Sequence, residues 1–315
     1  MDIESACILG GTGFVGRAVA DHLYSRGMRL RIVTRSRPRA MPLTVIPTAE
    51  VWVADSHDTA ALARAFEGMD VVVNLVGILH ETRHQTFRAC HAELPRKVAE
   101  ACRSAGVRHL LHMSALGAGP EAPSRYQRTK AEGEAAVRAA AGELQWTIFR
   151  PSVIFGEGDA FLNLFAKLVR WFPLVPLAGA HARFQPVWVE DVARAFAASA
   201  GNPDAFGRTF ELCGPKAYTL RELVERVGAT TGHAPRVMPL PGALARLQAA
   251  VLERLPGKLM TRDNLASMSV DNVCGCPFPE ALGFAPAALE AVMPEYLAAT
   301  AARARYAGYR HHAGR

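Results

Sequence analysis

Three residues near the middle of the chain have the types and spacing needed to move a proton. Tyr126 and Lys130 stand four residues apart in Tyr126-Gln127-Arg128-Thr129-Lys130, and residues at i and i+4 share one face of a helix. A nearby ammonium group favours the phenolate, so we expect Lys130 to lower the pKa of Tyr126 towards a useful acid–base range. Ser114 follows an apolar run and could hydrogen-bond a substrate oxygen. The alternative is an exposed helical pair and an ordinary serine at the end of a strand.

A glycine pattern near the start of the chain is typical of a dinucleotide site. The run Cys7-Ile8-Leu9-Gly10-Gly11-Thr12-Gly13-Phe14-Val15-Gly16 is apolar up to the glycines, and helical periodicity begins directly after it. Gly10 permits a tight strand-to-helix turn, Gly13 lets backbone amides approach a pyrophosphate, and Gly16 allows close packing. The N-terminus of the following helix favours the phosphate charge. The alternative is a glycine turn that binds no ligand.

The end of the second expected strand, Val33-Thr34-Arg35-Ser36-Arg37, bears on the choice of dinucleotide. A fold specific for NAD usually has an acidic residue there, about 20 positions after the glycines, that bonds the ribose 2′-hydroxyl. This chain has Thr34 and Arg35 instead, with Arg37 close by. Because guanidinium groups pair with a 2′-phosphate, we expect NADP(H) in preference to NAD(H). The alternative is that both arginines are ordinary surface residues.

The elements that must position these residues alternate through the first half of the chain. Apolar runs predict strands near 5–9, 29–34, 50–53, 70–76, 107–113 and 145–149, and helical periodicity predicts helices near 14–26, 58–67, 87–105 and 126–141. Such alternation indicates parallel βαβ units covered on both faces. After Pro151 prolines break the chain, and helices are expected near 219–231, 242–255 and 286–304.

The predicted fold is therefore α/β: a doubly wound parallel-sheet Rossmann domain with a smaller, mainly helical C-terminal lobe. The expected divisions are an NADP(H)-binding core at 1–150, a substrate or partner lobe at 151–305 interleaved with the core, and a frayed tail at 306–315.

Composition narrows the class of protein. The 315 residues carry a net charge of +7, with five lysines and 31 arginines scattered along the chain. They form no basic stripe interleaved with aromatic residues, which argues against a nucleic-acid partner. Six irregularly spaced cysteines are expected to be free thiols, and the close pair in Cys274-Gly-Cys276 lacks the further ligands of a metal site. We therefore expect no metal site. Because the first strand starts by about residue 5 and no apolar run reaches the ~18 residues of a membrane span, we also expect a cytoplasmic protein.

The order of these motifs resembles that of the short-chain dehydrogenase/reductase superfamily, in its extended or atypical form. Other segments are similar to the branch that contains the NADPH-carrying accessory subunit of respiratory complex I and its bacterial relatives. The resemblance covers roughly residues 5–300. Its further segments are Asn74-Leu75-Val76-Gly77-Ile78-Leu79, His112-Met113-Ser114-Ala115-Leu116, Arg150-Pro151-Ser152-Val153-Ile154-Phe155-Gly156, Phe161-Leu162-Asn163, Gln185-Pro186-Val187-Trp188-Val189-Glu190-Asp191-Val192 and Thr261-Arg262-Asp263-Asn264.

The resemblance implies roles for individual positions. Tyr126 would donate or accept the proton, Lys130 would bind the nicotinamide ribose, and Ser114 would polarise a carbonyl. Only twelve positions separate Ser114 from Tyr126, whereas sugar-modifying members have a longer loop there. The implied cofactor contacts are Gly10, Thr12, Gly13, Phe14, Val15 and Gly16 at the pyrophosphate, Thr34, Arg35 and Arg37 at the adenosine ribose, Asp55 at the adenine, Val76 and Gly77 at the middle, Tyr126 and Lys130 at the ribose, and Pro151, Val153 and Ile154 at the nicotinamide.

Three histidines and two apolar segments could each have a structural or a functional role. His80, His84 and His91 follow the fourth expected strand, where a substrate or quinone ring could lie, although such histidines are commonly structural. A helix near 242–255 has Leu244, Leu247, Val251 and Leu255 on one face, and a second apolar stretch runs from Phe161 to Pro173. Burial in the lobe explains both, and docking on a membrane or a hydrophobic partner is the alternative.

These observations predict an NADPH-dependent oxidoreductase that acts on a small apolar carbonyl or quinoid compound. One alternative is a non-catalytic NADPH-binding accessory or assembly protein for a respiratory complex or quinone biosynthesis, with peripheral contact at the inner face of the membrane. A second alternative is a nucleotide-sugar epimerase or dehydratase.

Overall fold

One parallel sheet forms the centre of the first of the two compact units into which the chain divides (residues 1–151, 189–212 and 274–285). The structure is a computed structural model that describes residues 3–140, 142, 144–255 and 259–298. The sheet order is β11-β6-β5-β4-β1-β2-β3, with every neighbouring pair parallel. Its strands are β1 (Ser5–Leu9), β2 (Arg29–Thr34), β3 (Ala49–Val53), β4 (Val71–Asn74), β5 (His109–Met113), β6 (Gln145–Pro151) and β11 (Arg208–Leu212).

The sheet confirms the predicted α/β fold class. The strand order reverses between β1 and β4, which is where doubly wound sheets bind ligands, beyond the carboxyl ends of the strands. Strand β1 is buried along its whole length, as a central parallel strand covered on both faces should be. The sequence analysis identified six of these strands and missed β11.

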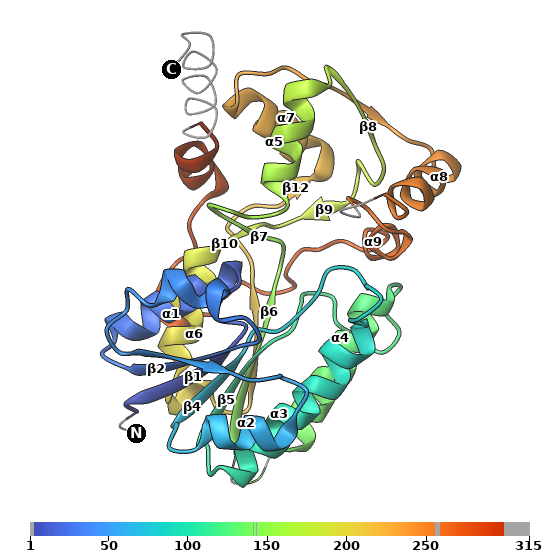
Figure 1. Ribbon diagram of the computed structural model, residues 1–315. Helices are drawn as coiled ribbons and strands as arrows, with labels where there is room; N and C mark the ends of the chain where they lie inside the picture. The colour runs from blue at the N-terminus through green and yellow to red at the C-terminus, as the bar shows by residue number, and fades with distance from the viewer. Residues whose placement is uncertain (1–2, 141, 143, 256–258, 299–315) are drawn as a thin grey trace. The chain divides into compact units, whose positions relative to one another are not determined.

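Helices cover both faces of this sheet (Figure 1). Helices α1 (Phe14–Ser25) and α6 (Val189–Ser199) pack together on one face. The other face carries α2 (Thr59–Phe66), α3 (Leu94–Ser104) and α4 (Arg125–Ala139). The core between α2, α3 and the sheet includes Leu62, Phe66, Leu94 and Leu110. Short turns of helix also occur at η1 (Arg37–Leu43), η2 (Arg88–Glu93), η3 (Pro203–Ala205) and η4 (Glu280–Leu282).

The second unit (residues 152–188, 213–273 and 286–315) has its own core around α5 (Leu162–Trp171) and α7 (Leu220–Thr230). It also contains α8 (Gly242–Leu252), α9 (Arg262–Ser267) and a helix that begins at residue 289 and reaches 298, the last described residue. Three strand pairs complete it: β7 (Ile154–Phe155) with β10 (Val187–Trp188), β8 (Leu174–Leu177) with β13 (Arg236–Pro239), and β9 (Arg183–Phe184) with β12 (Tyr218–Thr219).

This unit confirms a helical C-terminal region. The end of the helix expected at 286–304 and the expected tail at 306–315 lie outside the described residues. Within the described part of the chain, none of the helices is both long and apolar enough to cross a bilayer.

The cysteines depart in part from expectation. Cys7, Cys90 and Cys102 are free and buried, and Cys276 is free and exposed. Cys213 and Cys274 are each disulfide-bonded, so the expectation of six free thiols is wrong at these two positions.

Candidate functional site

The glycine loop connects β1 to α1 at the carboxyl edge of the sheet. Gly10 has φ +81°, and a Cβ there would lie 3.1 Å from the carbonyl carbon of Leu75. Only glycine therefore lets this turn approach the loop after β4 so closely. Gly13 is the N-cap of α1, and a Cβ on it would meet only the Gly10 carbonyl oxygen, at 3.2 Å. A Cβ on Gly16 would lie 2.2 Å from that same oxygen, so Gly16 is required for α1 to pack against the turn.

Thr12, Phe14 and Val15 lie in this loop and the first turn of α1. Because a glycine N-cap has no side chain, the first amides of α1 have no side-chain cap and can face a phosphate. The predicted pyrophosphate contacts are therefore gathered at one helix N-terminus, which is an arrangement suited to an anion.

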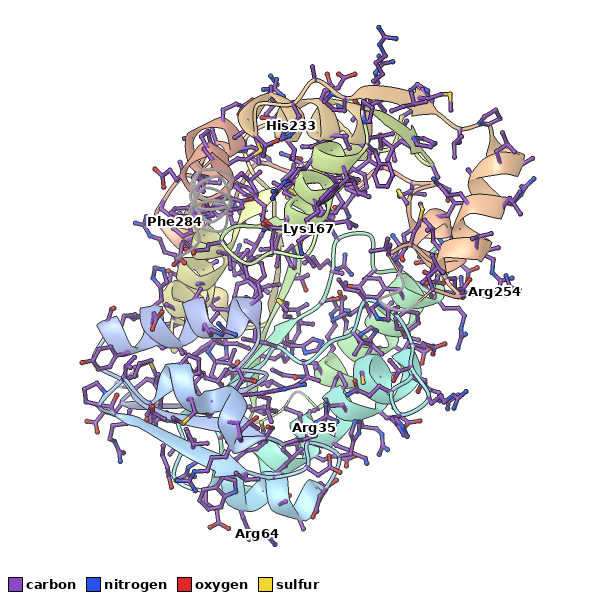
Figure 2. The ribbon with its side chains drawn as sticks, turned by 45° about the horizontal axis from the view of Figure 1, so that its top comes forward. Arg35, Arg64, Lys167, His233, Arg254 and Phe284 are labelled. Carbon is purple, nitrogen blue, oxygen red and sulfur yellow. The ribbon has the colours of Figure 1, made fainter. Side chains whose placement is uncertain are left out.

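The residues expected at the adenosine end follow β2 and β3. Thr34 ends β2, and its hydroxyl is bonded within its own turn to the backbone of Ser36. With the Gln85 amide turned so that its oxygen faces Arg35, the two terminal guanidinium nitrogens lie 2.9 and 3.3 Å from that oxygen. Arg35, which Figure 2 labels, thus reaches from the end of β2 to Gln85 in the loop after β4.

The other two residues expected at this end are near these strand ends as well. Arg37 is exposed at the start of η1. The Asp55 carboxylate follows β3 and accepts a hydrogen bond of 3.0 Å from the His57 amide. Parallel neighbours β2 and β3 therefore bring Thr34, Arg35 and Asp55 to the same edge of the sheet.

Two buried side chains accept hydrogen bonds from the backbone of the loop after β4. The Val76 amide donates to Asn74 Oδ1 at 3.2 Å, and the Ile78 amide donates to His91 Nε2 at 3.1 Å. A Cβ on Gly77 would lie 3.3 Å from Lys130 Nζ. Gly77 therefore gives this loop its close approach to the lysine.

His91 is the centre of a buried cluster that the sequence did not single out from its neighbours. Its Nδ1 lies 3.3 Å from Thr129 Oγ1. Its ring is stacked on the Phe87 ring, and it meets the Tyr126 ring edge-on, with 5.2 Å between the ring centroids. It lies in η2, a turn of π-helix that precedes α3, and such turns are frequent at functional sites. Burial lowers the pKa of His91 to about 2, so the ring stays neutral and can accept from Ile78. His80 and His84 instead lie on the more exposed loop before it.

Lys130 and Tyr126 lie on α4 as the spacing predicts, but the expected pKa effect is wrong. Lys130 Nζ donates to the Met113 carbonyl oxygen at 3.1 Å and lies 6.0 Å from the centroid of the Tyr126 ring. Burial lowers the pKa of Lys130 to about 8. Burial raises the pKa of Tyr126 to about 12, and the Lys130 ammonium, which lies over the ring and donates to a carbonyl, does not offset that rise. The phenol thus keeps its proton at neutral pH.

Two buried polar atoms near the end of β5 lack hydrogen-bond partners among the described residues. They are Ser114 Oγ and His112 Nε2, on side chains that are 2% and 1% exposed. The Ser114 hydroxyl is near enough to Glu134 to help lower the pKa of that carboxyl, yet it does not reach hydrogen-bonding geometry. Residues i and i+2 of a strand share a face, so both atoms are on one side of the sheet. An unpartnered buried hydroxyl is a candidate ligand contact.

Glu134 is a site residue that the sequence analysis missed. It lies one turn after Lys130, is fully buried, and accepts two hydrogen bonds of 2.7 Å from Arg150 and one of 2.9 Å from Arg138. Burial alone would raise its pKa, but the hydrogen bonds from Arg150, the nearby Ser114 hydroxyl and the charges of Arg150 and Arg138 together outweigh burial and lower it. The repeated four-residue spacing of Lys130, Glu134 and Arg138 was the signal that could have revealed it.

The residues expected beside the nicotinamide are divided between the two units. Pro151 ends β6 in the first unit, and its carbonyl oxygen accepts from the Leu116 amide at 2.9 Å. Val153 and Ile154 belong to the second unit, where Ile154 pairs with Val187. Their cofactor roles therefore stay predictions.

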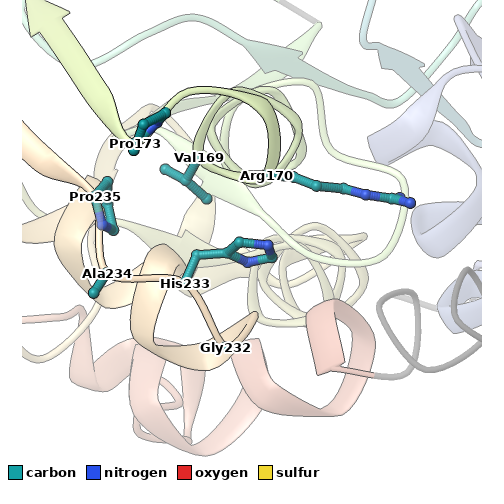
Figure 3. A pocket seen from close by; sticks show the side chains of 7 residues that line it. All are labelled: Val169, Arg170, Pro173, Gly232, His233, Ala234 and Pro235. Carbon is teal, nitrogen blue, oxygen red and sulfur yellow. The ribbon is translucent and has the colours of Figure 1, made fainter.

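The second unit also contains a cavity of about 320 Å³ beside the end of α5. Its two polar side chains do not converge. His233, in the segment 232–235, lies beside α5, while the Arg170 side chain extends away from it (Figure 3). The chemistry-bearing groups described above are all in the first unit.

Comparison with known proteins places this geometry in context. Residues 10–160 match a family described as NAD(P)H-binding. NADH dehydrogenase (ubiquinone) 1 alpha subcomplex subunit 9, mitochondrial, of Rattus norvegicus is 34% identical over 298 residues, covering 90% of this chain and 77% of that protein. Ceramide reductase of Caulobacter vibrioides is 32% identical over 235 residues, covering 74% of this chain and 73% of that protein. The NADPH-dependent quinone oxidoreductase of Escherichia coli solved with NADPH has a TM-score of 0.75 at 20% identity, covering 94% of this chain and 99% of that one, which shows a shared fold.

Proposed function

The chain belongs to the NAD(P)H-binding family that contains these alpha subcomplex subunit 9 proteins and related reductases, and on that premise we propose that it is an NADPH-dependent reductase. The substrate we propose is a small apolar carbonyl or quinoid compound. Names among the similar proteins support this class, since one relative is a ceramide reductase and one protein of the same fold is a quinone oxidoreductase. The cofactor we propose is NADPH, because Arg35 and Arg37 stand where a NAD-specific fold has an acidic residue.

The observation that carries the proposal is the buried group formed by Ser114, Tyr126 and Lys130. A bound NADPH would supply hydride to the carbonyl carbon. Tyr126 holds a proton at neutral pH and would donate it to the carbonyl oxygen. Ser114 Oγ, which has no hydrogen-bond partner among the described residues, would orient that oxygen. Lys130 supplies a positive charge over the Tyr126 ring and beside the Gly77 backbone.

The test is NADPH oxidation by the purified protein offered apolar ketones and quinones. Tyr126→Phe removes only the phenolic oxygen, and it should lower turnover by roughly 10²-fold or more while NADPH affinity stays nearly unchanged. Tyr24→Phe, on an exposed tyrosine of α1, is the matched control and should leave both unchanged. Full turnover by Tyr126→Phe would refute the proposed proton transfer.

A second candidate is a protein that holds NADPH without turnover and serves a respiratory complex or quinone biosynthesis. The observation that favours it is the similarity to complex I subunits over 90% of the chain. Complementation of a deletion strain separates the two. Rescue by Tyr126→Phe but not by Gly13→Val indicates an accessory role, whereas failure of both indicates catalysis.

One alternative function and the location of the protein complete the proposal. A nucleotide-sugar epimerase or dehydratase has less support, because only twelve positions separate Ser114 from Tyr126. We place the protein in the cytoplasm, in peripheral contact with the inner face of the membrane, and with no nucleic-acid partner.

A further inference from the structure

The second unit exposes large apolar side chains at the end of α5, on the β8–β13 strand pair and on α8. Trp171, Phe172 and Leu174 lie where α5 leads into β8, Met238 lies on β13, and Leu244, Leu247 and Val251 lie on α8. Their exposed fractions run from 45% to 73%. We call these seven residues the apolar belt. Soluble proteins rarely leave so many large apolar groups together in water without a use.

The strand pairing explains why the β8 and β13 members of the belt face the same way. Leu174 is opposite Arg236 and Pro176 is opposite Met238 in the β8–β13 register. Side chains alternate along a strand, so Val175 and Val237 face the core of the unit and are buried. Leu174 and Met238 therefore share the outer face.

Helix α8 lies against the same strand pair. Gln248 Nε2 donates to the Pro176 carbonyl oxygen at 2.9 Å, and Gln248 Oε1 accepts from the Ala178 amide at 3.3 Å. Ala245 and Ala249 are buried on that inner side of the helix.

The outer side of α8 is apolar where a solvent-facing helix is normally polar. Leu244, Leu247 and Val251 stand at i, i+3 and i+7, which places them on one stripe. The sequence analysis explained this stripe by burial, and the structure shows it exposed. The sequence-based alternative of docking is therefore the one that fits.

The charges around the belt are almost all positive. Segments 162–177 and 236–255 contain five basic residues and one acidic residue. The acidic residue, Glu253, is ion-paired with Arg262 at 2.9 Å. Arg170 lies over the Trp171 ring at 5.8 Å, and Lys167 and Arg254 are marked in Figure 2.

An apolar helix stripe, an exposed Trp in the same unit and basic residues in the same segments suit the surface of an anionic bilayer. Protein interfaces instead deplete charge at their centre and balance it across the contact. We propose that the second unit docks on anionic lipid through the apolar belt, with α8 lying in the headgroup region. This deepens the peripheral location proposed above and does not depend on Tyr126, Lys130 or turnover.

The experiment is sedimentation of the full chain with two kinds of vesicle, phosphatidylcholine alone and phosphatidylcholine mixed with phosphatidylglycerol. We expect binding to the mixed vesicles, at least ten-fold weaker binding to the neutral ones, and loss at high salt. Leu247→Glu with Val251→Glu should weaken binding to mixed vesicles at least ten-fold, and Arg246→Glu with Arg254→Glu should do so as well. Val45→Glu is the matched control, because Val45 is 80% exposed in the first unit, and it should bind as the wild type does.

Three results would overturn the docking proposal. They are equal binding by the Leu247/Val251 variant and the wild type, equal binding to both kinds of vesicle, and a wild type that binds neither. In the last case, a dimer dispersed by the Leu247/Val251 variant would identify a second copy of the chain as the occupant. NADPH affinity, measured on every variant, should be unchanged. A wild type that binds vesicles but not NADPH would refute the proposed function and leave docking intact.

Discussion

Replacing His91 with leucine tests whether the buried cluster below the loop after β4 prepares the cofactor site. The change keeps a side chain of similar size but makes it apolar, which removes the acceptor that the Ile78 amide uses at 3.1 Å. His91 is 1% exposed and Ile78 is half-buried, so the change removes the partner of a part-buried amide. A buried donor left without a partner costs about 1–3 kcal/mol. If half of that cost falls on the loop conformation that binds cofactor, NADPH affinity should drop by about two- to ten-fold.

His109→Leu is the control for this experiment. His109 is also fully buried, with Nδ1 accepting from the Gly201 amide at 3.2 Å and Nε2 2.9 Å from Thr147 Oγ1. Both variants should lose similar unfolding free energy in urea, but only His91→Leu should lose NADPH affinity by fluorescence titration. His91→Gln, which can still accept from Ile78, should recover part of the affinity. Equal losses of affinity in the two leucine variants would refute the reasoning.

Other variants test the remaining parts of the site. Gly13→Val should stay folded, since a Cβ there meets only one atom at 3.2 Å, yet it should abolish NADPH binding in titrations. Normal NADPH binding by this variant would show that the glycine loop does not bind the cofactor. NADPH should bind at least ten-fold more tightly than NADH, and Arg35→Gln should narrow that gap whereas Arg64→Gln on α2 should not. Burial lowers the pKa of His109 to about 4 and of His112 to about 3, so only the unfolded chain takes up their protons below about pH 6.5. Stability in urea should therefore fall from pH 6.5 towards pH 4, by about 1.4 kcal/mol per pH unit for each histidine, and His109→Leu should flatten that slope.

The sequence predicted the strands and helices of the first unit because their signals are local. The apolar run of β1 ends at glycines that the turn requires, and β2 matches the expected range. Strand β11, which pairs with β6, escaped prediction because it carries no continuous apolar run. Its five residues mix charged and apolar side chains as an edge strand does, so nothing local marks them as part of a parallel sheet.

In the candidate site too, residue spacing within one helix was predictable from the sequence, whereas contacts between distant segments were not. The spacing of Tyr126 and Lys130 was enough to place both on one helix. The pKa values were not predictable from it, since both shifts come mainly from burial by other elements of the fold. His91 likewise differs from His80 and His84 only through the partners that folding brings to it.

The opposite pKa shifts on α4 favour reduction over oxidation. Burial raises the pKa of Tyr126 to about 12, so the free phenol holds its proton throughout the neutral range and can donate to a carbonyl oxygen. An alcohol substrate would first need a phenolate, which is scarce at that pH. Lys130, with its pKa lowered to about 8, stays charged below that pH and becomes neutral above it. Reduction by NADPH should therefore be fastest near neutral pH and decline through pH 8, while a rate that rises steadily from pH 7 to pH 10 would show that the phenolate is the working form.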